Sequence, residues 1–493
     1  MNFKKRVLSV AVLAILAGVS MPALAGDQVT DQDLLKLIKQ QAAQIQQLKQ
    51  RLSALEAHEH QAAPQSGTVA TTASGADAAV ATPVDSRRQA GLQALRQAQL
   101  SAGTNTGESA EWGKFGAAGP TFSSSDGFFT FRPRGRLMED FSTTWGSKFP
   151  ERNIGGSRLE AARLGAQGTV GPLGYRLAVD FRGGKSNLRQ AYLSYSTSFF
   201  GHYKAKFSVG NLLKDIGVDS GSQSALVPFM LRNAAGTVGE PVNGYFGLGA
   251  QMRLYGTNWH YSLSVTGDTP GSSSSGDVSD SVAYVTRAHW NPIKNGSGFL
   301  HVGAWYAYEK IGGGVTKIND FPSIAVKFNG NLHVSASSIS DPTQDHSSGY
   351  ELGGVYRNFW VMSEYAKRTI DSSSTQSVHR HGSSLGAGWV ITGEKPGLST
   401  RSGTWRWVHV NRPVTTGGPG AFELVGRVDH YDFHGGAPRG GDGQSYTLGM
   451  NWYLNEWSRV MMNYIRWHTD NQVGSQKGSD WGNSLGMRLQ LLF

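Results

Sequence analysis

Residues 128–137 alternate between apolar and basic side chains, and this alternation constrains the fold more than any other stretch of the chain. With a period of two, the phenylalanines and the leucine share one face, and Arg132, Arg134 and Arg136 share the other. Three like charges in one column repel each other, which disfavours an ordinary solvated face of a soluble sheet. A membrane barrel explains the pattern, because one face meets lipid and the other a water-filled lumen.

The alternation continues beyond residue 114 in short segments separated by Gly, Asp, Asn, Ser and Pro. Residues 175–182, 203–209 and 261–265 are the clearest, and aromatic residues near many segment ends fit two membrane-interface girdles. The last segment ends on Phe493, which resembles the assembly signal of bacterial outer-membrane barrels. We expect an all-β transmembrane barrel. The alternative, a soluble β-sandwich, rarely needs so many consecutive short strands.

The number of strands follows from the length of residues 115–493. At roughly 20–25 residues per strand with its turns, they supply about sixteen antiparallel strands, enough to leave an aqueous channel. The connection at residues 210–243 is too long for a hairpin and too apolar for a dangling external loop, and residues 224–232 have a helical pattern. We expect this connection to fold inward as a constriction that carries Lys214 and Arg232.

Three segments precede the barrel. Residues 1–25 have the basic start, apolar run and Ala-Leu-Ala site of a secretory signal. Residues 26–57 predict a short periplasmic coiled coil and hence an oligomer, the alternative being a single amphipathic helix on another surface. Its seam consists of Leu34, Ile38, Gln41, Ile45, Leu48, Leu52 and Leu55. Residues 58–114 are a low-complexity linker that buries too little apolar surface to fold alone.

Composition adds two limits. The 493-residue chain has a formal net charge of +10, or +7 without the three signal cations, which suggests only a preference for anions. It has no cysteine, which excludes disulfides and thiolate metal sites, and no apolar run long enough for a transmembrane helix.

The chain resembles the phosphate-selective porin O/P family over nearly all of residues 127–493. The most specific motifs are residues 392–394 (Thr-Gly-Glu) and 451–455 (Asn-Trp-Tyr-Leu-Asn). The other matching stretches are residues 127–137, 158–165, 178–195, 207–214, 384–396, 420–428 and 448–455. The resemblance implies a homotrimer of sixteen-stranded barrels, a third external loop folded inward, and an arginine ladder for anions.

The family's ladder arginines occupy inward-facing strand positions. The corresponding anion-path candidates are Arg132, Arg134, Arg136, Arg176 and Arg182, followed by Arg158, Arg163, Arg189, Lys204 and Lys206. Arg158 and Arg163 have opposite parity and cannot both face the lumen on an unbroken strand. Alternatively, any one arginine only pairs with a lumenal carboxylate of the wall, such as Glu139, Glu160, Asp180 or Glu423. The dense basic runs of strongly phosphate-selective members are missing near the inward loop, which favours anion preference over phosphate specificity.

We therefore expect a bacterial outer-membrane porin for passive diffusion of small anions, including phosphate or polyphosphate. The alternative is a general porin or one for sugars or organic acids, and more remotely a barrel enzyme or adhesin. Residues 183–186 (Gly-Gly-Lys-Ser) resemble the end of a phosphate loop but sit in an expected hairpin turn, and His379 and His381 accompany no catalytic or metal signature. We expect no enzyme activity, cofactor, metal or nucleic acid. The expected partners are outer-membrane lipid, the barrel-assembly machinery acting on the C-terminal strand, and small anions.

Overall fold

A computed structural model describes residues 120–199, 203–270, 281–319, 322–336, 338–436 and 439–493. The predicted signal, coiled-coil seam and linker lie outside these residues. No helix in this part of the chain is long and apolar enough to cross a membrane.

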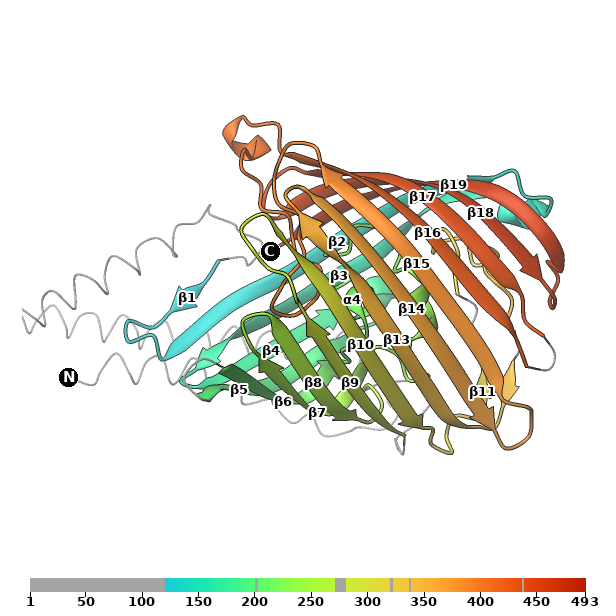
Figure 1. Ribbon diagram of the computed structural model, residues 1–493, viewed down its shortest axis with the longest axis horizontal. Coiled ribbons are helices and arrows are strands. Elements are labelled where there is room, and N and C mark those ends of the chain that lie inside the picture. The colour runs from blue at the N-terminus through green and yellow to red at the C-terminus, as the bar shows by residue number, and fades with distance from the viewer. Residues whose placement is uncertain (1–119, 200–202, 271–280, 320–321, 337, 437–438) are drawn as a thin grey trace, which may run out of the picture. The chain divides into compact units, whose positions relative to one another are not determined.

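Sixteen antiparallel strands form a closed barrel, shown in Figure 1. They are β2 (Phe129–Trp145), β3 (Gly155–Val170), β4 (Leu173–Asp180), β5 (Asn187–Phe199), β6 (Tyr203–Leu213), β7 (Phe246–Tyr255), β8 (Trp259–Thr266), β9 (Val282–Trp290), β10 (Gly298–Lys310), β13 (Pro342–Tyr356), β14 (Phe359–Ser372), β15 (Val378–Val390), β16 (Ala421–Gly435), β17 (Asp442–Tyr453), β18 (Ser458–Asn471) and β19 (Gly478–Leu492). Each pairs with the next, β10 pairs with β13, and β19 pairs back onto β2. The predicted barrel of about sixteen strands is confirmed.

The remaining strands are short. β1 (Phe122–Ser123) pairs with the start of β2, and β11 (Lys317–Ile318) pairs with β12 (Ile339–Ser340) outside the barrel sheet.

The alternation of β2 sorts its side chains as predicted. Phe131, Leu137 and Phe141 are exposed on the outer face, while Arg136 and Asp140 are buried on the inner face. The same rule holds on the last strand, where Leu485, Leu489 and their neighbours point outward and Arg488 inward. The outer surface is therefore apolar and the inner surface polar, as a membrane barrel requires.

Phe493 completes the closure of the barrel on β2. Its backbone carbonyl accepts a 2.7 Å hydrogen bond from the Gly135 N–H, and its own N–H donates to the Gly135 carbonyl at 3.1 Å. The Phe493 ring lies over Gly135, where a Cβ atom would come within 2.0–2.5 Å of three ring carbons. The glycine therefore makes room for the terminal aromatic ring.

Replacing Gly135 with alanine should turn the Phe493 ring away and weaken closure by about 1–3 kcal/mol, as overpacking does elsewhere. The measurement is the midpoint of the heat-induced mobility shift of the refolded barrel on gels. Gly426→Ala on β16 is the matched control, because the nearest atom to its added Cβ lies 3.6 Å away. Equal midpoints for the two variants would contradict the role assigned to Gly135.

Three connections fold into the barrel rather than away from it. The first, residues 214–245 between β6 and β7, contains α4 (Val218–Gly221) and α5 (Ala234–Val238), and α4 is visible inside the ring of strands in Figure 1. The second joins β10 to β13 and the third, residues 391–420, joins β15 to β16. The largest buried apolar clusters form where these connections meet the inner wall of β13–β19, so the protein core lies within the barrel.

The expected helical pattern at residues 224–232 is wrong, since both helices of the first connection lie outside it. Carbonyl groups of this stretch bind side chains of the barrel wall instead of forming helical hydrogen bonds. Arg459 donates to the carbonyls of Ala225 and Val227, and Arg427 donates to that of Leu231. Tertiary contacts thus replace the local hydrogen bonds that the sequence pattern suggested.

Short 3-10 turns complete the list of helical elements. They are η1 (Pro150–Arg152), η2 (Arg182–Gly184) and η3 (Val414–Thr416). The expected turn at residues 183–186 is confirmed: Gly183 and Gly184 both adopt a φ of +72°, which favours glycine. The sequence there follows a strand but opens no α-helix, so it is not a phosphate loop.

Candidate functional site: a basic half-lumen

Four cavities lie along the inner wall of β2–β7, and together we call them the basic half-lumen. Chamber 1 (about 540 Å³) lies between β5–β6 and residues 401–406, and chamber 2 (about 550 Å³) lies against β2–β4. Chamber 3 (about 270 Å³) lies between β4–β7 and the first and third inward connections. Chamber 4 (about 460 Å³) lies against the start of β2 and β3–β6.

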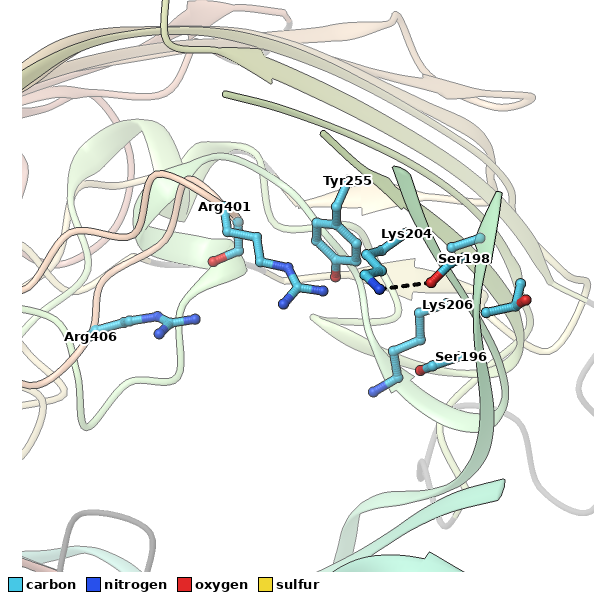
Figure 2. Close-up of a pocket in the computed structure, with 10 residues that line it drawn as sticks. Ser196, Ser198, Lys204, Lys206, Tyr255, Arg401 and Arg406 are labelled. Atoms are coloured by element: carbon cyan, nitrogen blue, oxygen red, sulfur yellow. Dashed lines mark hydrogen bonds between the residues drawn. The ribbon is translucent and has the colours of Figure 1, made fainter. Parts of the chain in front are cut away.

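Chamber 1 shows how the strands and the third connection cooperate. Lys204 and Lys206 reach into it from β6, and Arg401 and Arg406 reach in from the opposite side (Figure 2). The Arg401 guanidinium packs over the Tyr255 ring at 4.6 Å, and Lys204 Nζ donates to Ser198 Oγ at 2.7 Å. Four cations from two separate elements therefore surround one water-accessible space.

The chambers share their basic lining. Arg176 borders chambers 2, 3 and 4, Lys206 borders 1, 3 and 4, and Arg406 borders 1, 2 and 3. No aspartate or glutamate lines chambers 1, 3 or 4, and chamber 2 has Glu456 alone. The Glu456 carboxylate already pairs with His409 at 2.6 Å. The potential along this path is thus set by cations.

Arg176, Lys206 and Arg406 also have no carboxylate partner within the described part of the chain. Lys206 Nζ lies 5.4 Å from the centre of the Tyr192 ring, and the Arg176 and Arg406 side chains make no hydrogen bond to a described residue. A cation without an internal counter-charge attracts anions from solution. These three residues are therefore the best placed to act on a passing solute.

The predicted candidates on β2 all face the lumen, but they differ in their contacts. Arg132 lines chamber 4 and donates to Thr121 Oγ1, while Arg134 lines chamber 2. Arg136 also borders chamber 2, yet it donates to Gln223 Oε1 at 2.7 Å and Ser224 Oγ at 3.1 Å in the first inward connection. Arg136 therefore anchors that connection to the wall.

Arg158 and Arg163 both face inward because a β-bulge breaks the register of β3. Ala161 pairs with Met138 and Leu159 with Glu139, so Glu160 is an extra residue between them. The bulge resets the parity, and both arginines then oppose inward-facing residues of β2. The sequence excluded this outcome only for an unbroken strand.

The same pairing corrects the reading of Glu139 as a lumenal carboxylate. Glu139 opposes Leu159 and the exposed Leu489 on the outer face. Glu423, by contrast, is buried on the inner face, where it accepts hydrogen bonds from Trp360, Asn451 and Tyr453.

Several predicted ladder cations are engaged with wall carboxylates. Arg158 and Arg182 approach Glu160, and Arg163 and Arg189 approach Asp180, at 2.9–3.7 Å. Arg182 lies on the η2 turn and not on the strand as predicted, because β4 ends at Asp180. Arg163 borders chamber 2, whereas Arg158, Arg182 and Arg189 border none of the four chambers. For these residues the wall ion pair is the better description.

Lys214 and Arg232 belong to the inward connection but do not line the four chambers. Lys214 is fully buried, and its Nζ has no hydrogen-bond partner. Arg232 donates to the Ser222 carbonyl at 2.8 Å and packs over the Tyr245 ring. The expectation that these two cations line the constriction is wrong, because both serve the internal packing of the connection.

The other inner wall, along β9–β19, carries arginines that are paired. Arg368 binds Asp345 through two hydrogen bonds, and Arg488 binds Asp140 in the same way. Buried bidentate pairs of this kind neutralise each other. The lumen is therefore divided into a structural half and a basic half.

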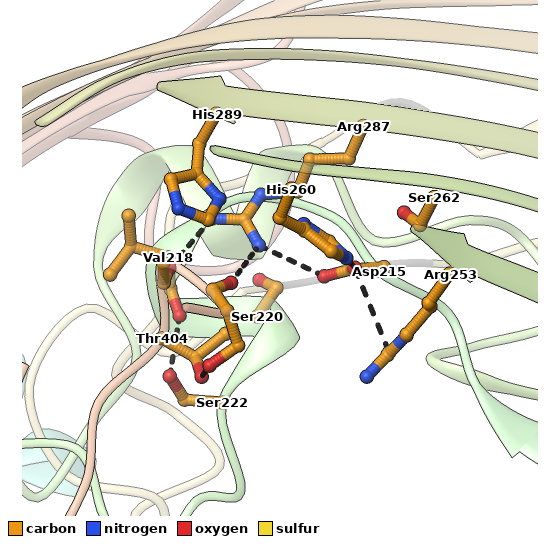
Figure 3. A network of polar contacts seen from close by, with 12 residues as sticks. Asp215, Val218, Ser220, Ser222, Arg253, His260, Ser262, Arg287, His289 and Thr404 are labelled. Carbon is orange, nitrogen blue, oxygen red and sulfur yellow. Dashed lines mark hydrogen bonds and ion pairs between the residues drawn. The ribbon is translucent and has the colours of Figure 1, made fainter. Parts of the chain in front are cut away.

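Arg287 on β9 joins the wall to two inward connections (Figure 3). It forms two hydrogen bonds with Glu351 at 2.7 and 2.8 Å and one with Asp215 at 3.0 Å. It also donates to the carbonyls of Ser402 and Gly403 in the third connection. One guanidinium thus fixes the segment that carries Arg401 and Arg406.

Asp215 and Asp219 lie on the first inward connection and respond differently to burial. Burial raises the pKa of Asp215, but Arg253 and Arg287 outweigh it and hold that pKa well below its usual range. At Asp219 burial prevails and raises the pKa, although Arg427 lies 3.7 Å away and Trp405 Nε1 donates to it at 2.6 Å. Asp215 therefore stays ionised at neutral pH as the counter-charge of the cations around it.

Sequence reasoning missed three basic lining residues, Arg253, Arg401 and Arg406. Arg253 is on an inward position of β7, so strand parity was an available signal. Arg401 and Arg406 lie on a connection of about thirty residues, which carries Trp405 and Trp407. Such length and apolar content indicated an inward fold for residues 210–243 and could have done so here.

A closed sixteen-stranded barrel, apolar outside and hydrated within, defines a porin channel of the bacterial outer membrane. No group of three or more His, Asp or Glu side chains in the described residues is arranged to hold a metal ion. The family model described as phosphate-selective porin O and P matches residues 131–493. The chain belongs to this family, which confirms the resemblance and the expected location.

Individual relatives are distant. An uncharacterised protein of Caulobacter vibrioides is 24% identical over 479 residues, covering 94% of this chain and 91% of the relative. Porin O of Pseudomonas aeruginosa is 23% identical over 427 residues, covering 80% and 96%. The solved structure of an anion-selective porin from Comamonas acidovorans aligns with a TM-score of 0.46 at 13% identity, covering 74% of this chain and all of that one.

Proposed function

We propose that this porin conducts small anions in preference to cations through the basic half-lumen. The observation that carries the proposal is the shared lining of the four chambers by cations, with Glu456 as their one acidic lining residue. A fixed positive charge lowers the free energy of an anion in the pore, and several weak sites in series let it move on. The channel needs no catalytic group, so the fold and family are those of a transporter rather than an enzyme.

Phosphate is the first solute to test, because the family description names it. Guanidinium groups suit it, since they stay charged and bind phosphate oxygens as a fork. An organic anion is the second candidate, because the lining is not limited to cations: chambers 2 and 3 also contain glutamine side chains.

The assembly of the channel is also a proposal. We propose a secreted precursor, a homotrimer held in part by a coiled coil of residues 26–57 in the periplasm, a flexible linker over residues 58–114, and insertion by the barrel-assembly machinery through the C-terminal strand. The apolar outer face supports contact with outer-membrane lipid.

The decisive experiment is the reversal potential of the reconstituted channel in a potassium chloride gradient. Arg132→Ala and Arg134→Ala should each lower the anion/cation permeability ratio about twofold, since one unit charge at ~7 Å in water is worth about 0.6 kcal/mol before screening. Arg136→Ala should also increase current fluctuations, because it releases Gln223 and Ser224. Lys367→Ala, on the exposed outer face of β14, is the control. A wild-type channel that prefers potassium would refute the proposal.

A further inference from the structure

Chamber 3 contains more neutral hydrogen-bonding groups than an inorganic anion can use. Its lining includes four cations, Arg176, Lys206, Arg253 and Arg406, and no acid. Nine further lining residues carry neutral amide or hydroxyl groups. An inorganic anion is satisfied by N–H donors, and acceptor oxygens beside it are repulsive. The neutral groups therefore need another explanation.

Most of these neutral groups are already engaged. Gln223 accepts from Arg136, Gln251 donates to the Leu213 carbonyl, and Ser222 donates to the Val218 carbonyl. Ser402 and Thr404 share a hydrogen bond. These groups hold the two inward connections in place and are not available to a solute.

Gln190 and Tyr192 are different. Both side chains point into the lumen from β5, and neither makes a hydrogen bond to a described residue. Tyr192 is the direct cross-strand partner of Arg176, and Lys206 Nζ lies over its ring at 5.4 Å. The juxtaposition places a phenol and a carboxamide, which can donate and accept, beside two cations that have no carboxylate partner among the described residues.

The space is also larger than a bare ion needs. At about 270 Å³, chamber 3 alone corresponds to roughly nine water molecules at ~30 Å³ each, and it shares its lining with the larger neighbouring chambers. A solute of several carbon atoms fits this volume, and its hydroxyl groups could pair with Gln190 and Tyr192 while its charge lies near Arg176 and Lys206.

We propose that the preferred solute is a hydroxylated organic anion, a polyol carrying one acidic group. The anionic group binds between Arg176 and Lys206, and the hydroxyl groups exchange hydrogen bonds with Gln190 and Tyr192. This inference rests on the proposed anion preference and specifies its substrate class.

The test compares gluconate with hexanoate, two six-carbon carboxylates that differ in their hydroxyl groups, as blockers of the chloride current of the full-length channel. Gluconate should reach half-block at an about tenfold lower concentration, a ratio that corresponds to 1.4 kcal/mol. Glucose, which lacks the charge, should block weakly. The double variant Gln190→Leu/Tyr192→Phe should reduce the gluconate advantage to less than threefold, whereas Tyr365→Phe on the outer face of β14 should preserve it.

The outcomes separate the two proposals. Equal block by gluconate and hexanoate in a wild-type channel that prefers chloride to potassium overturns the substrate class and leaves the anion preference intact. Block by glucose equal to that by gluconate overturns the role of the acidic group. Loss of the wild-type preference for chloride in the reversal potential overturns both. The comparison of ligands on the wild type decides the matter even if the double variant fails to fold.

Discussion

Replacing Arg287 with methionine should destabilise the barrel by about 3–5 kcal/mol, the typical cost of removing one partner from a buried ion pair. The substitution leaves Glu351 with His301 and leaves Asp215 with the more distant Arg253 and His260. Two backbone carbonyls of the third connection lose their donor as well. The measurement is the urea dependence of unfolding of the refolded protein at pH 7.

The pH of this measurement matters because of Asp215. Its pKa is depressed in the folded protein, so its contribution to stability is complete above its ordinary pKa of about 4 and is lost only as the pH falls through the depressed value. At pH 7 the experiment therefore compares fully ionised partners. In Arg287→Met, loss of a nearby cation should raise the pKa of Asp215 and move its titration toward ordinary acid pH.

Arg466→Met is the control for loss of an arginine as such. Arg466 lies on the exposed outer face of β18, where it packs over Trp481 and donates to Asn483. Its removal should cost less than about 1 kcal/mol. The triple variant Arg287→Met/Glu351→Gln/Asp215→Asn should recover much of the loss, because it removes the uncompensated charges. Equal stability of Arg287→Met and wild type would show that Arg287 does not hold the connections.

The barrel was predictable because its signal is periodic. Outward residues such as Leu137 and inward ones such as Arg136 differ in burial as their parity requires, and the C-terminal Phe493 closes on β2. Strand number followed from length alone. The first inward connection was also predictable, because its apolar content had to be buried somewhere.

The division of the arginines was not predictable, because a strand position fixes a face and not a partner. Arg163 and Arg176 both face the lumen, but only Arg163 finds a carboxylate, Asp180, among the described residues. That contact depends on register and on bulges such as the one at Glu160, which no local pattern specifies. Arg406 was beyond reach for a different reason: it enters the lumen on a connection and has no strand parity.

Reversing the charge at Arg176, Lys206 and Arg406 together should turn the channel from anion-selective to cation-selective. Each reversal changes the energy of a monovalent ion at ~7 Å by about 1.2 kcal/mol in water, and screening at 0.1 M salt reduces the sum by roughly half. The effect has opposite signs for chloride and potassium, so the permeability ratio should change by about a hundredfold. The reversal potential of Arg176→Glu/Lys206→Glu/Arg406→Glu measures it directly.

This triple variant should fold, because the side chains of Arg176, Lys206 and Arg406 make no ion pair to a described residue and the substitutions break no wall contact. The neutral variant Arg176→Gln/Lys206→Gln/Arg406→Gln should lie midway between it and wild type. Lys367→Glu on the outer face adds a negative charge away from the lumen and should leave the ratio unchanged. Because the three cations border all four chambers, a triple variant that still prefers chloride would place the selective section outside the basic half-lumen.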